Sequence, residues 1–114
     1  MDADETTESW GSRKIVDKAD DYQLQLIIVK ANQSTENFYT HNVTKRLYIL
    51  EGNLDLETTF ENKPEKITLA RLTYAFIIEP SAWHKYSNPY DSDCHILEIE
   101  YVNGGSEYDF ERYR

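Results

Sequence analysis

Two stretches of the sequence each place one histidine beside an apolar run that ends in a turn. The first, FYTHNVTKRLYILEG (38–52), contains His41, and the second, EPSAWHKYSN (79–88), contains His84. Imidazole is both a common metal ligand and a proton carrier near neutral pH. His41 and His84 therefore indicate either a metal site divided between two parts of the chain or an acid–base pair.

The two stretches are expected to be strands, in which successive side chains point to opposite faces. Tyr39 and His41 would then share one face of the first strand. In the second stretch one face would carry His84, Tyr86 and Asn88. If both faces turn inward, the two imidazoles meet in the mouth of one barrel.

A tightly held zinc, iron or manganese ion normally has at least three imidazole, carboxylate or thiolate ligands. The stretches offer His41, His84 and the phenol of Tyr39, whose ordinary pKa near ~10 makes it a poor ligand at neutral pH. Lys45 would add a positive charge beside the ion. We therefore expect no tightly bound metal, and the alternative is a weakly held divalent ion (Mn, Zn or Fe) on the two histidines.

Lys45 lies within an apolar strand pattern, and a buried ammonium is costly unless it is paired. Glu98 and Glu100 share a face of a later strand and are the expected partners. The alternatives are that Lys45 binds a phosphate or carboxylate of a ligand, or that it points to solvent.

Further candidate residues are those able to line the same pocket. Trp83 is either a packing residue or a platform on which a sugar ring stacks. Tyr86, Asn88 and Glu100 complete the candidate ligand-binding set. His41, His84, Tyr39 and Lys45 are the candidates for chemistry.

The 114 residues are enough for one domain, and their net charge of −9 makes nucleic acid and anionic membrane unexpected partners. The single cysteine, Cys94, allows no internal disulfide and is expected to be a small buried hydrophobe. The chain shows neither a signal peptide nor an apolar run of membrane-spanning length, so a cytoplasmic location is expected. Residues 1–9 are acidic and polar and are expected to form a flexible arm ahead of a domain at 10–114.

From residue 10 onward the pattern indicates eight to ten short strands spaced 8 to 12 residues apart, which is typical of an all-β jelly-roll barrel. A turn at 61–66 contains Pro64, which is not expected inside a strand ladder. The tail 106–114 is expected to form one helical turn. The predicted strands are 12–18, 22–31, 38–43, 45–51, 54–60, 66–72, 73–79, 83–87 and 94–102.

The two histidine stretches resemble the signature motifs of the cupin superfamily. Tyr39, His41, Lys45 and Gly52 stand where its first motif has two histidines, a glutamate and a glycine. The resemblance implies a single-domain cupin barrel. It also implies that two of the four metal-ligand positions, those with tyrosine and lysine, have changed.

The second motif of that superfamily has a proline, a histidine and an asparagine. Pro80, His84 and Asn88 stand at these positions, although the spacing between the proline and the histidine is one residue shorter than in the family.

More of the chain is similar to the cupin domain of type II mannose-6-phosphate isomerases, which interconvert mannose 6-phosphate and fructose 6-phosphate with a divalent metal. The resemblance implies that the protein holds a sugar phosphate or another small polar ligand in the barrel with reduced or no metal-dependent catalysis. The alternative is an active aldose–ketose isomerase that uses a metal or a His/Tyr acid–base pair. A homodimer is also expected. The matching segments are 8–11, 28–30, 48–52, 77–80, 83–84, 99–100 and 110–113.

Overall fold

The structure is a computed structural model that describes residues 5–40, 42–60, 63–71, 75–80 and 82–102. His41 and the tail predicted to form a helical turn lie outside the described residues. Predictions that concern them stay predictions.

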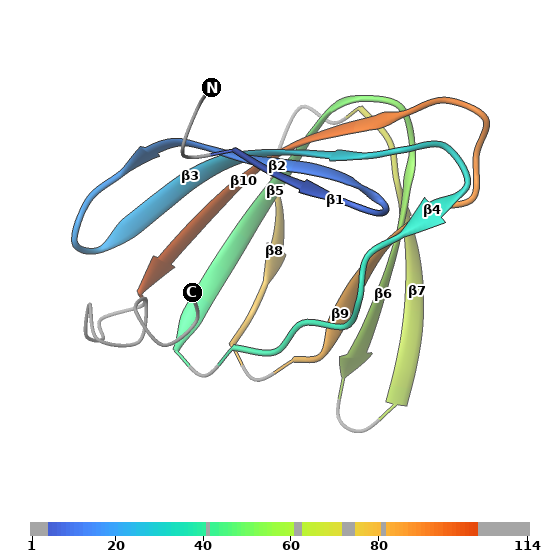
Figure 1. The fold of residues 1–114 in the computed structure, drawn as a ribbon. Helices are drawn as coiled ribbons and strands as arrows, with labels where there is room; N and C mark the ends of the chain where they lie inside the picture. Colours follow the sequence, from blue (N-terminus) through green and yellow to red (C-terminus); the bar gives the residue numbers. More distant parts are fainter. Residues whose placement is uncertain (1–4, 41, 61–62, 72–74, 81, 103–114) are drawn as a thin grey trace.

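Within the described residues, ten β-strands form two antiparallel sheets (Figure 1). The larger sheet has the order β1-β2-β3-β10-β5-β8, and the smaller has the order β4-β9-β6-β7. Figure 1 shows the two sheets close together at one end and diverging toward the other. The strands are β1 (Glu5–Glu8), β2 (Gly11–Lys18), β3 (Tyr22–Val29), β4 (Gln33–Ser34), β5 (Val43–Glu51), β6 (Leu54–Phe60), β7 (Lys63–Leu69), β8 (Phe76–Ile78), β9 (His84–Asn88) and β10 (Cys94–Val102).

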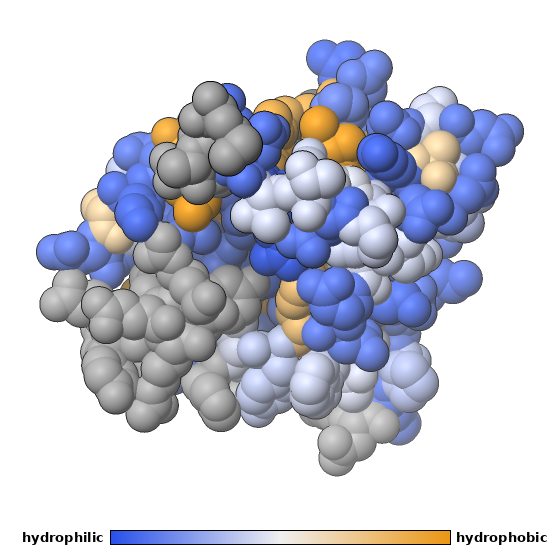
Figure 2. Space-filling model, in the orientation of Figure 1, coloured by the Kyte–Doolittle hydropathy of each residue, from blue (hydrophilic) through white to orange (hydrophobic). Residues whose placement is uncertain are grey.

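This arrangement confirms the predicted all-β, double-sheeted barrel. No helix of the length and hydrophobicity needed to cross a membrane occurs in the part of the chain that the structure describes. Figure 2 shows a mostly hydrophilic face on which hydrophobic residues occupy small, separate areas, in keeping with the acidic composition.

Strict alternation along the central strands builds the interior between the sheets. Every second residue of β3 and of β10 is buried, and the others are half-buried on the outer face. Cys94 is fully buried, as predicted, and this burial raises the pKa of its thiol to about 12. The apolar half of the interior consists of Trp10, Ile27, Val29, Leu47, Ile49, Leu54, Leu56, Leu69, Ile78, Tyr86, Cys94 and Ile96.

The inward faces of the same strands change from apolar to polar toward one end. On β3, the inward-facing residues are Val29 and Ile27 toward one end of the strand and Gln25 and Gln23 toward the other. Both glutamines are at most 4% exposed. On β10, Glu98 and Glu100 take the same inward direction beyond the apolar residues. One half of the barrel is therefore an aliphatic core, and the other half is a buried polar cluster that holds the candidate site.

Gly52 ends β5 in a conformation that only glycine adopts easily. Its φ is +86°, and a Cβ at this position would lie 2.5 Å from the carbonyl oxygen of Asp93. The tight turn from β5 into β6 therefore depends on a residue without a side chain.

Two strand predictions were wrong in their details. Pro64 lies within β7, where proline is tolerated because β7 is the edge strand of the smaller sheet. In the segment predicted as a strand at 38–43, Phe38 makes only an isolated bridge to His84. There the Thr40 hydroxyl donates a hydrogen bond to the Val43 carbonyl oxygen at 3.0 Å, so the chain turns into β5 instead of pairing.

Residues 1–4 of the predicted flexible arm at 1–9 lie outside the described residues, and most of the described part is a strand. Glu5 to Glu8 form β1, which pairs with residues 11–14 of β2 and makes an edge of the larger sheet. Backbone pairing thus holds this acidic segment although its side chains are mostly exposed.

Replacement of Leu56 by alanine is expected to lower the free energy of unfolding by about 2–5 kcal/mol, because the side chain is fully buried and its loss leaves a cavity. Chemical denaturation measures this change. Leu50→Ala is the matched control, since Leu50 is 45% exposed and should cost about 0.5 kcal/mol or less. Equal losses in the two variants would contradict the described core.

Candidate functional site

Lys45 lies inside the barrel and is paired with a carboxylate. Its side chain is 2% exposed, and its Nζ atom lies 3.5 Å from Oε1 of Glu98. The ammonium also lies 5.0 Å from the centre of the Phe38 ring, a favourable distance for a cation–π contact. The predicted carboxylate partner for Lys45 is therefore confirmed as Glu98, and the prediction that Lys45 points to solvent is excluded.

A glutamine and a tyrosine complete this cluster. Gln25 Nε2 donates hydrogen bonds to Oε2 of Glu98, at 2.5 Å, and to Oε1 of Glu100. The Tyr86 hydroxyl donates to Oε1 of Glu98. Glu98 thus accepts bonds on both oxygens from three neighbouring strands: β3 through Gln25, β5 through Lys45 and β9 through Tyr86. The sequence analysis did not single out Gln25. Because Gln25 lies two residues before Ile27, both share one face of the strand, and this position could have indicated that Gln25 is buried.

The pKa values of the two carboxyl groups of the cluster are shifted in opposite directions. Burial alone raises the pKa of Glu98, but the charge of Lys45 and the hydrogen bonds from Tyr86 and Glu100 outweigh it and hold that pKa below its ordinary value. Burial, followed by the negative charge of Glu98, raises the pKa of Glu100 well above its ordinary value. Glu98 is therefore the anion that balances Lys45, and Glu100 takes up a proton more readily than an ordinary glutamate does.

His84 faces the same interior from β9 and is neutral. Its pKa is lowered from 6.5 to about 4, first by burial and then by the charge of Lys45. Nδ1 lies 3.0 Å from the carbonyl oxygen of Ala82. Because a carbonyl can only accept, Nδ1 carries the proton and Nε2 carries a lone pair. Nε2 is buried and has no hydrogen-bond partner among the described residues.

Of three further candidates, Tyr39 and Trp83 are exposed at the surface, and Asn88 is buried on the same face of β9 as His84. Tyr39 and Trp83 are 38% and 51% exposed, with ring centroids 5.0 Å apart, and so belong to the surface and not to the buried cluster. Tyr39 is not in a strand, so period-two reasoning did not apply to it. The Asn88 amide donates to the carbonyl oxygens of Val29 and Ser92, and its Oδ1 accepts from the Tyr90 amide. Asn88 therefore holds the turn after β9, and its polar atoms are engaged there.

A hollow of about 330 Å³ lies between the edge strand β8 and strands β6 and β7. We call it the inter-sheet hollow. It adjoins the buried cluster, because Ala82 lines it, Ile78 is the register partner of Lys45, and Thr58 is the register partner of His84. Its lining residues are Thr58, Thr59, Glu65, Ile67, Phe76, Ile77, Ile78, Glu79 and Ala82.

The described residues do not fit a divalent metal. Within them no group of three or more histidine, cysteine, aspartate or glutamate side chains converges. The Glu98 carboxylate is paired with the ammonium of Lys45. The predicted alternative of a metal on His41 and His84 involves a residue outside the described part and stays a prediction.

Comparison with solved structures identifies the architecture. The structure superposes on an oxalate decarboxylase of Lactobacillus farciminis, solved as a formate complex, with a TM-score of 0.76 and 14% identity, over 90% of this chain and 32% of that one. It also superposes on the cupin domain of Cnp3 of Schizosaccharomyces pombe, with a TM-score of 0.68 and 8% identity, over 80% and 65% of the two chains. The chain has a cupin fold.

A third match is TT1209 of Thermus thermophilus, with a TM-score of 0.69 and 19% identity, over 79% of this chain and 81% of that one. The cupin chain spans about a third of the length of the oxalate decarboxylase, and at these identities the likeness concerns the fold alone. No protein-family model matches the sequence, and no curated protein matches it.

Replacing Lys45 by methionine is expected to lower the free energy of unfolding by about 3–5 kcal/mol, because Glu98 is then left buried without its counter-charge. Denaturant titration at pH 7 measures the change. Lys66→Met is the control, since the Lys66 side chain is 64% exposed and lies 4.0 Å from Asp55, so its loss should cost less than about 1 kcal/mol. A Lys45→Met protein as stable as the wild type would show that the pair is not needed.

The lowered pKa of His84 predicts acid sensitivity. Between pH 6.5 and about 4 the unfolded chain takes up a proton at this imidazole and the folded chain does not, so stability falls as the pH is lowered. The wild type should therefore lose up to about 3 kcal/mol more than His84→Gln between pH 7 and pH 4. Urea denaturation of both proteins across this range measures the difference, and parallel pH profiles would contradict a buried neutral imidazole.

Proposed function

We propose that this cupin-fold protein binds a small polar ligand, of the sugar or sugar-phosphate type, in the inter-sheet hollow, without metal-dependent turnover. The observation that carries the proposal is a hollow of about 330 Å³ whose lining includes Ala82, the residue whose carbonyl oxygen binds the buried, neutral His84. This volume is at the lower end of the range for small-molecule pockets. The site would therefore take a ligand about the size of a monosaccharide.

The lining of the hollow supports a ligand that combines apolar faces with hydroxyl donors. Ile67, Phe76 and Ile78 provide walls for C–H groups. Glu65 and Glu79 provide acceptors, and neither a lysine nor an arginine is among the described lining residues. Because this charge distribution repels a phosphate, the proposal favours a neutral sugar over its phosphate ester.

The state of the buried groups favours binding over turnover. Isomerisation of an open-chain sugar needs a base whose pKa lies near neutrality, and the pKa of His84 is about 4. Glu98 is ionised, but Lys45, Tyr86 and Gln25 already occupy its oxygens. These groups would hold and orient a hydroxyl more readily than they would remove a carbon-bound proton.

The homodimer predicted from sequence is part of the proposal. β1 lies at an open edge of the larger sheet, and open edges present backbone groups to another strand. A second copy of the chain is the partner we propose for that edge.

Titration calorimetry with mannose, mannose 6-phosphate and fructose 6-phosphate tests the proposal, together with an assay for their interconversion in the presence of manganese or zinc. We expect mannose to bind, the phosphates to bind less tightly, and no conversion to occur. Glu79→Ala should weaken binding about tenfold through the loss of a hydrogen bond to a charged group. Glu51→Ala is the control, because Glu51 is exposed and is not among the residues that line the hollow.

Two outcomes would contradict the proposal. Absence of binding to all three compounds would show that the protein does not bind ligands of the sugar or sugar-phosphate type. Interconversion of the sugar phosphates by the wild type, but not by His84→Ala, would show that the protein is an isomerase and not only a binding protein.

A further inference from the structure

The outer face of the larger sheet carries apolar side chains where a sheet face in contact with water usually carries polar ones. Along β3 and β10 the residues buried inside the barrel alternate with outward-pointing residues that are half-buried. We call the outward apolar residues of three adjacent strands the outer apolar face. They are Leu24, Leu26 and Ile28 on β3, Leu97 and Ile99 on β10, and Tyr48 and Leu50 on β5.

The smaller sheet shows the usual arrangement, which makes the larger sheet the exception. On β6, Leu56 is fully buried, and its neighbours Asp55 and Glu57 take the opposite face of the strand. Their register partners on β9, Ser87 and Lys85, are polar as well. The apolar character is therefore a property of one sheet face and does not follow from the fold itself.

Strand register joins the outer apolar residues into one patch. Leu97 is the register partner of Leu26 on β3 and of Tyr48 on β5, so it lies at the centre of a row. In the next row Ile99 is the partner of Leu24. Adjacent strands lie about 4.8 Å apart, so side chains within a row are in contact distance of each other. Proteins that remain monomeric rarely expose a continuous apolar patch of this extent.

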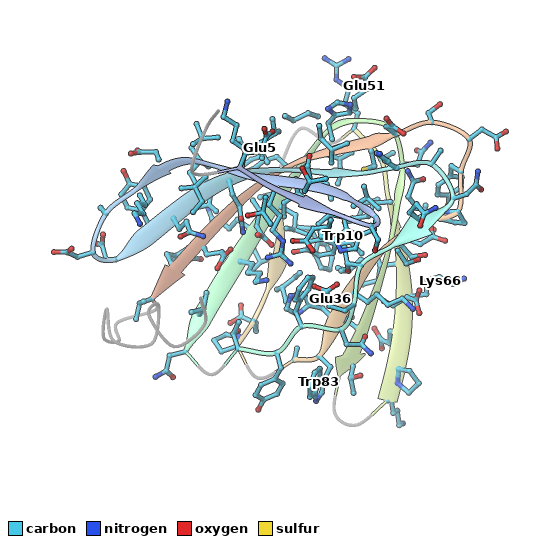
Figure 3. All side chains as sticks on the ribbon, in the orientation of Figure 1. Glu5, Trp10, Glu36, Glu51, Lys66 and Trp83 are labelled. Carbon is cyan, nitrogen blue, oxygen red and sulfur yellow. The ribbon has the colours of Figure 1, made fainter. Side chains whose placement is uncertain are left out.

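The described part of the chain leaves this face without a covering strand. Every described strand belongs to one of the two sheets, and the smaller sheet lies against the inner face of the larger one. Figure 3 shows Glu51, at the end of β5, pointing away from the barrel, whereas Lys66 and Trp83 lie on the side of the smaller sheet. The outer apolar face is thus available to a partner.

The charges around the patch allow a second copy of this acidic chain to approach. The net charge of −9 makes two copies repel each other over most of their surface. The patch itself is bordered by Lys14 on β2 and Arg46 on β5. Glu51 and His95, which lie 4.0 Å apart, stand at one of its ends. An apolar centre with a polar rim that carries both signs of charge is typical of a protein interface.

We propose that two copies of the chain pack outer apolar face against outer apolar face about a two-fold axis near Leu97. A two-fold interface brings the same patch of both copies together, so the central row of one copy meets that of the other. Four strands of about eight residues give each face roughly 500 Å². The pair would bury about 1,000 Å², the size at which specific interfaces begin.

This inference does not depend on the proposed ligand. It gives the homodimer a surface other than the β1 edge, and it accounts for apolar side chains that pairing through β1 would leave in contact with water.

Sedimentation velocity of the full chain over a range of concentrations tests the proposal. The wild type should sediment as a dimer. Leu97→Glu should raise the dissociation constant at least about hundredfold, because two like charges would meet at the axis. Ser87→Glu is the matched control, since it adds the same charge to the outer face of the smaller sheet and should leave the dimer intact.

Thiol labelling of Leu97→Cys gives a second readout that does not rely on a disruptive variant. The native Cys94 is fully buried, so a maleimide would report the new thiol. Labelling at a concentration that favours the dimer should be at least about tenfold slower than after dilution to the monomer, because a reactive thiol must be accessible.

Thr6→Pro, which disrupts β1, separates the two possible interfaces and should leave the dimer intact. Dissociation by Thr6→Pro but not by Leu97→Glu would overturn the proposal and leave the β1 edge as the interface. A wild type that is monomeric at every concentration would also overturn it. A reactive thiol in such a monomer would assign the face to a different protein, and an unreactive one would show that another part of the chain covers it.

Discussion

The buried ion pair between Lys45 and Glu98 is the constraint on which the polar half of the barrel depends. An ammonium and a carboxylate cannot both lie among apolar walls unless they face each other and their remaining polar atoms are satisfied. Here β5 supplies the cation and β10 the anion, while β3 and β9 supply Gln25 and Tyr86. The side chains around this charge pair thereby connect strands of both sheets.

Burial is the first cause of the pKa shifts of Glu100 and His84, and the charges of this pair add to it. The negative charge of Glu98 disfavours a second negative charge on Glu100, and the positive charge of Lys45 disfavours protonation of His84. The cluster consequently combines an anion, a cation, a carboxyl group with a raised pKa and a neutral imidazole.

Period-two patterns predicted the architecture well, because a strand that lines a core must alternate. The bounds predicted at 54–60 and 94–102 are those of β6 and β10. The partner of Lys45 was also predictable, since the cost of a buried ammonium demanded a carboxylate on a neighbouring strand. Pro64 was misplaced because the rule against proline in a ladder does not apply to an edge strand, and no local pattern tells which strand will be an edge.

The site was less predictable than the fold, for a physical reason. Tyr39 was assigned to the interior by treating its segment as a strand, but that segment follows hydrogen bonds that alternation does not encode. Gln25 was missed because its role depends on two residues more than seventy positions away in the chain.

The cation beside Glu98 is part of the polypeptide, whereas a metal ion would have to be taken up from the surroundings. Lys45 is present from the moment the chain is synthesised, and neither chelation nor exchange with competing ions can remove it. The internal charge balance around Glu98 is therefore independent of metal availability in the surroundings.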